Sequence, residues 1–259
     1  PEAFCPRKKK ELFMKFKKDN FMPPLPDGTI EKTLQYEGGA TWIFAQRALA
    51  NTELDCSECR YLEVGPKHGI HTLLIDCHKP KSITCVESPG KLRHNETFLR
   101  YNRTWVPHIE TEDFEMLYQD FGRFSSKEKY DLLFYCGVLY HNIDQMGHLK
   151  KLHDLASEDA YVIFESCTSR NKDLKDKNLI EIHYQPYSDL YRGAVTPIFF
   201  PTKLACMSML EISGWNVLET SDDYSDISNP ERVTILCQKG SPMKNPGSAS
   251  PIEIDSTYE

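Results

Sequence analysis

Short apolar runs alternate with helical stretches along most of this chain, and this alternation constrains the fold more than any other feature. Runs with strand character occur at residues 61–64, 82–86, 131–136 and 160–164. Strands that are apolar on both faces and separated by helices are typical of a parallel sheet covered by helices. Two later runs, 215–218 and 233–237, are separated only by a polar loop and predict an antiparallel pair. We therefore predict an α/β fold with a doubly wound, mostly parallel sheet, an antiparallel closing strand and an N-terminal helical segment.

The two ends of the chain differ in composition from its middle. Residues 1–57 are expected to form a basic arm and an N-terminal helical cap, because apolar residues recur at helical spacing between 29 and 50. Residues 58–240 contain the alternating runs and are expected to form the sheet domain. Residues 241–259 are rich in Pro, Ser and Gly and predict a flexible tail.

Charge and cysteine content narrow the class of protein. The formal net charge is −7, and seven basic against three acidic side chains in residues 1–20 leave 11 excess negative charges in the remainder. No apolar run approaches the roughly 20 residues of a membrane span. An odd count of nine cysteines suits a reducing compartment, so we expect a cytoplasmic protein without a membrane association. Cys56 and Cys59 have zinc-type spacing without a second pair, so we expect no metal site.

Two features at successive strand ends indicate a nucleoside-containing ligand. The first run leads into Glu63-Val-Gly65-Pro-Lys67-His-Gly69, where glycines allow a tight turn beside the amino end of a helix. The second run ends in Glu87, eighteen residues after Gly69. A carboxylate at that distance is placed to accept hydrogen bonds from both ribose hydroxyls. In a doubly wound sheet, both features belong to the edge where ligands bind.

These residues resemble a known family. The turn resembles motif I of the class I S-adenosylmethionine-dependent methyltransferases, acid-x-Gly-x-Gly-x-Gly, with Lys67 in place of the middle glycine. The segment YDLLFYCGVLYH at 130–141 resembles the fourth-strand motif of that superfamily. Its Gly-Val-Leu-Tyr-His portion is nearest to the subgroup of tRNA wobble-uridine carboxymethyltransferases and their small-molecule relatives. The resemblance covers about residues 58–240 and implies a Rossmann-like methyltransferase fold, methyltransferase activity and S-adenosylmethionine as cofactor.

The resemblance also implies roles for individual residues. Glu63 faces the methionine ammonium, and Glu87 holds the ribose. Gly65 and Gly69 let the turn pass beneath the cofactor. Lys67 meets the cofactor carboxylate, points to solvent, or alters the pocket. An acidic patch after the third strand, represented by Glu112 and Asp113, contacts adenine, and the methionine portion lies against Cys136 and Gly137.

The acceptor side is predicted from residues around the fourth and fifth strands. We expect His141 to act as general base, because the unperturbed pKa of histidine lies near working pH. Tyr140 orients the acceptor or the cofactor. A lid is expected at residues 171–196, and Tyr36 and Trp42 of the N-terminal cap form the opposite wall. The lid residues that contact the acceptor are expected to be Tyr184, Tyr187, Tyr191 and Arg192.

Three functional interpretations remain open at this point. A small-molecule acceptor is favoured over nucleic acid, because the chain is acidic outside residues 1–20. An RNA (tRNA) methyltransferase that uses the basic arm is the first alternative. A non-catalytic binding module with the same fold is the second, and Lys67 is the feature that speaks for it. The sequence does not settle the oligomeric state.

Overall fold

The computed structural model describes residues 39–88, 103, 105–183 and 197–242. Its helices are α3 (Gly39–Leu49), α4 (Ile70–Asp76), α6 (Gln145–Leu155) and α7 (Lys203–Ile212). Its strands are β1 (Arg60–Val64), β2 (Ser82–Glu87), β3 (Phe114–Tyr118), β4 (Tyr130–Cys136), β5 (Ala156–Cys167), β6 (Ile180–His183), β7 (Ile198–Pro201), β8 (Trp215–Thr220) and β9 (Arg232–Lys239). Short 3-10 turns lie at Cys56–Glu58, Val106–His108, Phe121–Arg123, Leu139–His141, Lys172–Leu174 and Ser221–Asp223.

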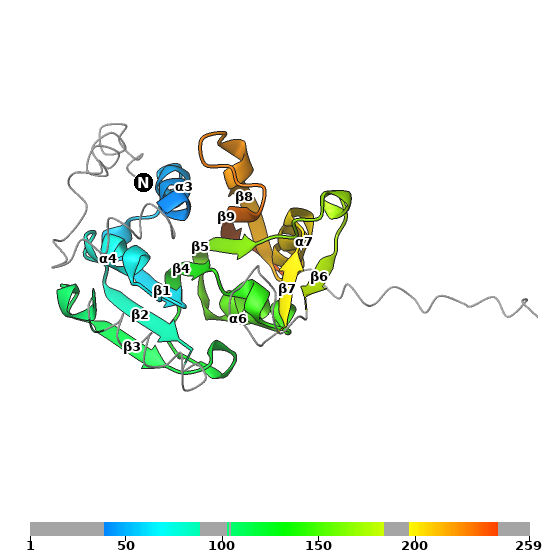
Figure 1. The fold of residues 1–259 in the computed structure, drawn as a ribbon. Helices are drawn as coiled ribbons and strands as arrows, with labels where there is room; N and C mark the ends of the chain where they lie inside the picture. Colours follow the sequence, from blue (N-terminus) through cyan, green and yellow to red (C-terminus); the bar gives the residue numbers. More distant parts are fainter. Residues whose placement is uncertain (1–38, 89–102, 104, 184–196, 243–259) are drawn as a thin grey trace, which may run out of the picture.

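A seven-stranded sheet forms the centre of the molecule, in the order β3-β2-β1-β4-β5-β9-β8 (Figure 1). Strands β1 to β5 run parallel to one another. Strand β9 runs antiparallel to both β5 and β8. The strand order reverses between β1 and β4, as it does in doubly wound sheets. The predicted fold, including the antiparallel pair near the end of the chain, is therefore confirmed.

Helices cover both faces of this sheet, and each face has its own apolar core. Helices α3 and α4 pack on one face, where Phe44 and Leu73 join Tyr61 and Phe134 of the strands. Helices α6 and α7 pack on the other face. Because strands β1, β2 and β4 are buried on both sides, they contain continuous apolar runs rather than an alternating pattern. This is why their positions were predictable from the sequence.

The structure adds an element inside the predicted lid. Strand β6 pairs antiparallel with β7 in a separate two-stranded sheet, so residues 180–183 are held by strand pairing. Residues 184–196, which contain the four predicted lid contacts, lie outside the described residues. The arm at 1–20 and the tail from 243 onward also lie outside the described residues. The predicted domain boundaries stay a prediction. In the part of the chain that is described, no helix is long and apolar enough to cross a bilayer.

Most of the predicted cofactor-site residues lie along one edge of the large sheet. The carboxyl ends of β1 to β5 lie along this edge, because these strands are parallel. The amino end of β9 lies at the same edge, since β9 is antiparallel and its Arg232 pairs with Cys167 at the end of β5. Ligands of open α/β sheets bind outside this edge.

Candidate active site

The turn after β1 keeps the backbone of a glycine-rich loop although it contains a lysine. Gly65, Lys67 and Gly69 have φ angles of 72°, 48° and 68°, so every second residue is left-handed. A left-handed conformation costs a residue with a Cβ roughly 1–2 kcal/mol. Lys67 therefore accepts a backbone that favours glycine, and its side chain is exposed at the surface.

Two contacts hold the backbone of Lys67 from opposite sides. Its N–H donates to Oε2 of Glu87 at 3.0 Å, and its carbonyl accepts from Nε1 of Trp105 at 3.3 Å. Glu87 ends β2, and Trp105 lies just before the 3-10 turn Val106–His108. The turn is thus fixed by residues from two other segments, and this explains how a strained lysine is maintained there.

The two glycines of the turn face protein groups rather than open space. A Cβ added to Gly69 would overlap the indole ring of Trp105, which is fully buried. A Cβ added to Gly65 would lie 2.9 Å from Cγ2 of Val138, in the segment after β4. Glycine is therefore required at both positions by close packing as well as by the positive φ angles. The predicted passage of the turn beneath a cofactor stays a prediction.

Glu63 has three partners inside the protein. Its carboxylate accepts hydrogen bonds from the hydroxyls of Tyr61 and Thr72, and Nδ1 of His71 lies 3.3 Å from its other oxygen. His71 and Thr72 belong to the first turn of α4. Glu63 therefore joins β1 to the start of α4. Its predicted contact with the methionine ammonium stays a prediction.

Glu87 is a buried carboxylate at this edge. The side chain is 4% exposed, and burial raises the pKa of Glu87 above its usual range, opposed by the backbone N–H groups of Lys67 and Ser88. Its two oxygens accept one hydrogen bond each from those N–H groups, at 3.0 and 2.9 Å. A carboxylate offers about four acceptor positions. The described residues leave two positions of this carboxylate open, as many as a ribose diol needs.

The predicted adenine contacts are wrong in their placement. Strand β3 begins at Phe114, so Glu112 and Asp113 come before it and not after it. The carbonyl of Asp113 accepts from Ile83 at the start of β2, at the edge opposite the candidate site. The polar residues Gln119 and Asp120 follow β3, at the edge where the carboxyl ends of the parallel strands lie. Gln119 N–H donates to the carbonyl of Glu87, so this pair lies next to the predicted ribose carboxylate.

An ion pair between a buried carboxylate and a half-buried guanidinium lies beside the end of β4. The N–H of Gly137 donates to the carbonyl of Glu165, and Cys136 lies opposite Glu165 in the sheet register. The Glu165 carboxylate binds the Arg232 guanidinium through two contacts of 2.5 and 3.0 Å. Burial lowers the pKa of Arg232, but the charge of Glu165 outweighs this effect and raises it overall. Arg232 is therefore a permanent cation that neutralises the carboxylate behind Gly137.

Sequence reasoning missed this ion pair, although a signal was present. Glu165 directly follows the apolar run 160–164, and Arg232 directly precedes the run 233–237. Charges that flank two apolar runs meet at one edge when the strands are antiparallel neighbours. Recognising them needs the pairing of β5 with β9, which the sequence alone does not specify.

His141 lies at the site, but its pKa does not suit the predicted role. Desolvation by the surrounding protein lowers the pKa of His141 to about 4, and the charges of Arg232 and Lys67 lower it as well. The premise of an unperturbed pKa is therefore wrong. His141 is neutral at physiological pH, and its basicity is low. Tyr140 is buried, with its ring centroid 4.3 Å from that of His141 and stacked on Phe200 at 6.0 Å.

Trp42 belongs to the apolar core between the sheet and the helices α3 and α4. It is buried between α3 and α4, with its ring stacked on His71 at 6.3 Å and near Phe134 at the same distance. This face of α3 packs on the sheet and on α4, and the predicted wall contact of Trp42 stays a prediction. Tyr36 lies outside the described residues, as do the four lid contacts.

Solved structures place this arrangement in a known fold. A methyltransferase from Listeria monocytogenes, described as a putative S-adenosylmethionine-dependent enzyme, matches 80% of this chain over its whole length, with a TM-score of 0.58 at 11% identity. The chain has the fold of class I S-adenosylmethionine-dependent methyltransferases. A second such methyltransferase, from Mesorhizobium loti, matches 80% of the chain and 100% of its own length with a TM-score of 0.55 at 12% identity.

A third match covers more of the chain. The 1,6-didemethyltoxoflavin-N1-methyltransferase of Burkholderia thailandensis, solved with 1,6-didemethyltoxoflavin and S-adenosylhomocysteine, matches 93% of this chain and 92% of its own length. Its TM-score is 0.56 at 10% identity. No protein-family model matches the chain, and no curated protein does. The resemblance to the wobble-uridine subgroup gains no support from these matches and stays a prediction.

The packing of Trp105 on the turn can be tested with two glycine substitutions. Gly69→Ala should lower the free energy of unfolding by about 2–5 kcal/mol, because it combines a left-handed backbone with a clash against the indole. Gly137→Ala is the control, since its φ is 74° but the nearest atom to a new Cβ is 3.7 Å away. It should cost about 1–2 kcal/mol. Equal losses in urea denaturation would contradict the clash.

The strain at Lys67 can be tested in the same way. Lys67→Gly relieves a left-handed cost of about 1–2 kcal/mol and adds about 0.5–1 kcal/mol of backbone entropy loss. The free energy of unfolding should therefore rise by up to ~1.5 kcal/mol. Lys67→Ala keeps the Cβ and serves as the control, with little expected change. Destabilisation by the glycine variant would show that the side chain itself supports the turn.

The low pKa of His141 gives a pH-dependent prediction. The unfolded chain binds a proton near pH 6.5 and the folded protein near pH 4, so His141 makes the protein less stable as the pH falls through this window. His141→Gln removes this titration and should lose less stability than wild type between pH 6.5 and 4. Denaturation at several pH values measures the difference. NMR titration of the imidazole near pH 6.5 would contradict it.

Proposed function

We propose that this protein is a methyltransferase that uses S-adenosylmethionine to methylate a small organic acceptor. The observation that carries the proposal is the pairing of Glu87 with the left-handed turn after β1. The Glu87 carboxylate fixes the turn through Lys67 and retains two acceptor positions at the ligand-binding edge. This fits the ribose of the cofactor. The comparisons support the proposal because their fold is the one that carries this chemistry.

Each part of the cofactor has candidate partners along this edge. Glu87 would hold the ribose. Gln119 and Asp120, which follow β3, replace Glu112 and Asp113 as candidates for the adenine contact. Gly137 would face the methionine portion, with the neutralised Glu165–Arg232 pair behind it. Lys67 is the cation of the turn and a candidate partner for the cofactor carboxylate.

The protein residues would act mainly by positioning. When bound, S-adenosylmethionine supplies a methyl group on a positively charged sulfur, which departs as a neutral thioether when a nucleophile attacks the methyl carbon. Orientation and fixed electrostatics can provide much of the rate enhancement for such a transfer. His141, with its pKa near 4, is a weak base and would serve to orient the acceptor as a neutral hydrogen-bonding group. Methylation would make the acceptor atom more positive and its proton more acidic. The acceptor would then release that proton to solvent.

A small-molecule acceptor is preferred for two reasons. The chain carries excess negative charge outside residues 1–20, which disfavours binding to phosphate backbones. The Burkholderia thailandensis structure, which shares the fold, holds a small heterocyclic compound.

The role of Glu87 can be tested by calorimetry. Glu87→Ala should weaken binding of S-adenosylmethionine and S-adenosylhomocysteine by about tenfold to a hundredfold, because hydrogen bonds to a charged partner contribute about 1–3 kcal/mol. Glu112→Ala is the matched control, since this carboxylate lies at the opposite edge and its loss should leave affinity unchanged. If wild-type protein shows no binding at millimolar cofactor, the proposed function fails. If both variants weaken binding equally, Glu87 is not the ribose partner.

A further inference from the structure

The hairpin of β6 and β7 carries exposed apolar side chains close together. Leu179, Ile180 and Ile182 are 44%, 43% and 64% exposed. They make up three of the eight exposed large hydrophobic residues in the described part of the chain. Single exposed apolar side chains are ordinary on protein surfaces, whereas a group of them marks a contact surface. The four residues 179–182 therefore need a partner that covers them.

The backbone of β6 is paired on one side among the described residues. β6 hydrogen-bonds to β7 in a sheet of two strands. Thr202 N–H donates to the carbonyl of Leu179, so these two residues form a hydrogen-bonded pair. Such pairs alternate with non-hydrogen-bonded pairs along an antiparallel ladder. Ile180 and Ile182 therefore occupy non-hydrogen-bonded positions, and their N–H and C=O groups point away from β7.

The contacts of β7 agree with this alternation. Pro201 and Phe199 stand opposite the two isoleucines. The Pro201 carbonyl accepts from Ser169 N–H, and the Phe199 carbonyl accepts from Nε2 of Gln145, both outside the hairpin. The body of the protein thus holds β7, and β6 is the outer strand of the hairpin (Figure 1).

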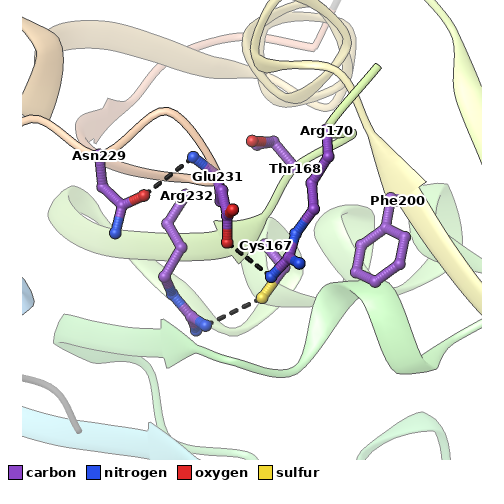
Figure 2. A pocket seen from close by; sticks show the side chains of 7 residues that line it. All are labelled: Cys167, Thr168, Arg170, Phe200, Asn229, Glu231 and Arg232. Atoms are coloured by element: carbon purple, nitrogen blue, oxygen red, sulfur yellow. Dashed lines mark hydrogen bonds and ion pairs between the residues drawn. The ribbon is translucent and has the colours of Figure 1, made fainter. Parts of the chain in front are cut away.

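The inner face of the hairpin is polar at β6 and aromatic at β7. Glu181 and His183 lie on this face, and the His183 ring packs against Phe200 at 5.3 Å. Phe200 also lines the cavity at the end of β5 (Figure 2). Oε1 of Glu181 lies 2.9 Å from Nε2 of His183, and both side chains are half-buried. A strand added at the outer edge of β6 would therefore meet one carboxylate and one imidazole.

We propose that the outer edge of β6 pairs antiparallel with β6 of a second copy of this protein, which gives a symmetric dimer. An edge strand offers its unpaired N–H and C=O groups to another strand, and natural proteins often protect such edges with Lys or Pro. β6 has neither, and both residues whose backbone points outward are isoleucines. Two identical antiparallel strands are related by a two-fold axis, so the same patch serves both copies.

Charge complementarity favours a second copy as the partner and defines the register. Pairing centred on Glu181 would place two carboxylates directly opposite each other, which is destabilising. Pairing centred on Ile180 would place each Glu181 opposite Leu179. Pairing centred on Ile182 places each Glu181 opposite His183 of the other copy, at a non-hydrogen-bonded position where side chains are closest. In this register the strand is complementary to itself, and the two Ile182 side chains meet on the outer face.

The size of the contact predicts a weak dimer. Interfaces that bury less than about 1,200 Å² are typical of transient complexes. A pair of four-residue strands lies at this lower end. We therefore expect a dissociation constant on the order of 10–100 μM.

Sedimentation velocity of the full chain, from low micromolar to near-millimolar concentration, tests the assembly. The protein should pass from monomer to dimer across this range. A monomer at the highest concentration would overturn the proposal, and so would a species larger than a dimer, because two-fold pairing is closed. The measurement involves no cofactor and no methyl transfer, so its outcome is independent of the proposed function.

Two lysine substitutions locate the interface. Ile182→Lys places a charge at the centre of the strand pair and should weaken the dimer by at least about tenfold. Ile143→Lys is the matched control, because this isoleucine is 83% exposed but lies between β4 and α6. It should leave dimerisation unchanged. Thermal melting checks that both variants are folded. Equal dimerisation of the two folded variants would show that β6 is not the interface.

An exchange of the polar pair tests the register. His183→Glu alone brings carboxylates together twice across the strand pair and should weaken the dimer by about threefold to thirtyfold. The double variant Glu181→His/His183→Glu again sets each carboxylate opposite an imidazole, so it should recover most of this loss. Melting curves check that both variants are folded. If the double variant dimerises no better than the single one, the proposed pairing is wrong.

Discussion

The backbone of a single exposed residue, Lys67, determines how the candidate site is assembled. Its N–H is held by Glu87 and its carbonyl by Trp105, so the ends of β1 and β2 and the segment before β3 meet at one peptide. These contacts maintain a left-handed lysine between two left-handed glycines. Because Glu87 fixes the turn and also offers its remaining acceptor positions to a ligand, the local structure and the proposed ribose contact depend on the same carboxylate.

The sequence was sufficient for the central strands and for the turn, for a physical reason. Strands buried on both faces must be apolar along their length, and a tight turn beside a helix requires glycine at particular positions. Strand β3 could not be recognised in this way, because it is an edge strand whose side chains are exposed or half-buried and need not be apolar. Its start at Phe114 therefore could not be located, and Glu112 and Asp113 were assigned to the wrong end of the strand.

Other features could not be predicted where a residue's surroundings come from distant parts of the chain. Trp42 has the same helical spacing whatever it packs against, and its contacts with His71 and Phe134 could not be read from that spacing. The pKa of His141 depends on Arg232, which reaches the site only because β9 pairs with β5. Local pattern cannot supply such information. The pairing of Glu165 with Arg232 was missed for the same reason.

Because β9 runs antiparallel to β5, it places its first residue at the edge where the parallel strands place their last residues. The turn, Glu87 and Gly137 lie at the carboxyl ends of parallel strands, whereas Arg232 is the first residue of β9. The connection between β8 and β9, residues 221–231, leads into that residue and contributes Asn229 and Glu231 to a cavity that Cys167, Phe200 and Arg232 also line. Insertions or substitutions in this connection can reshape the cavity while leaving the turn untouched. In a lineage of such proteins, the cavity and the turn can therefore change independently of each other.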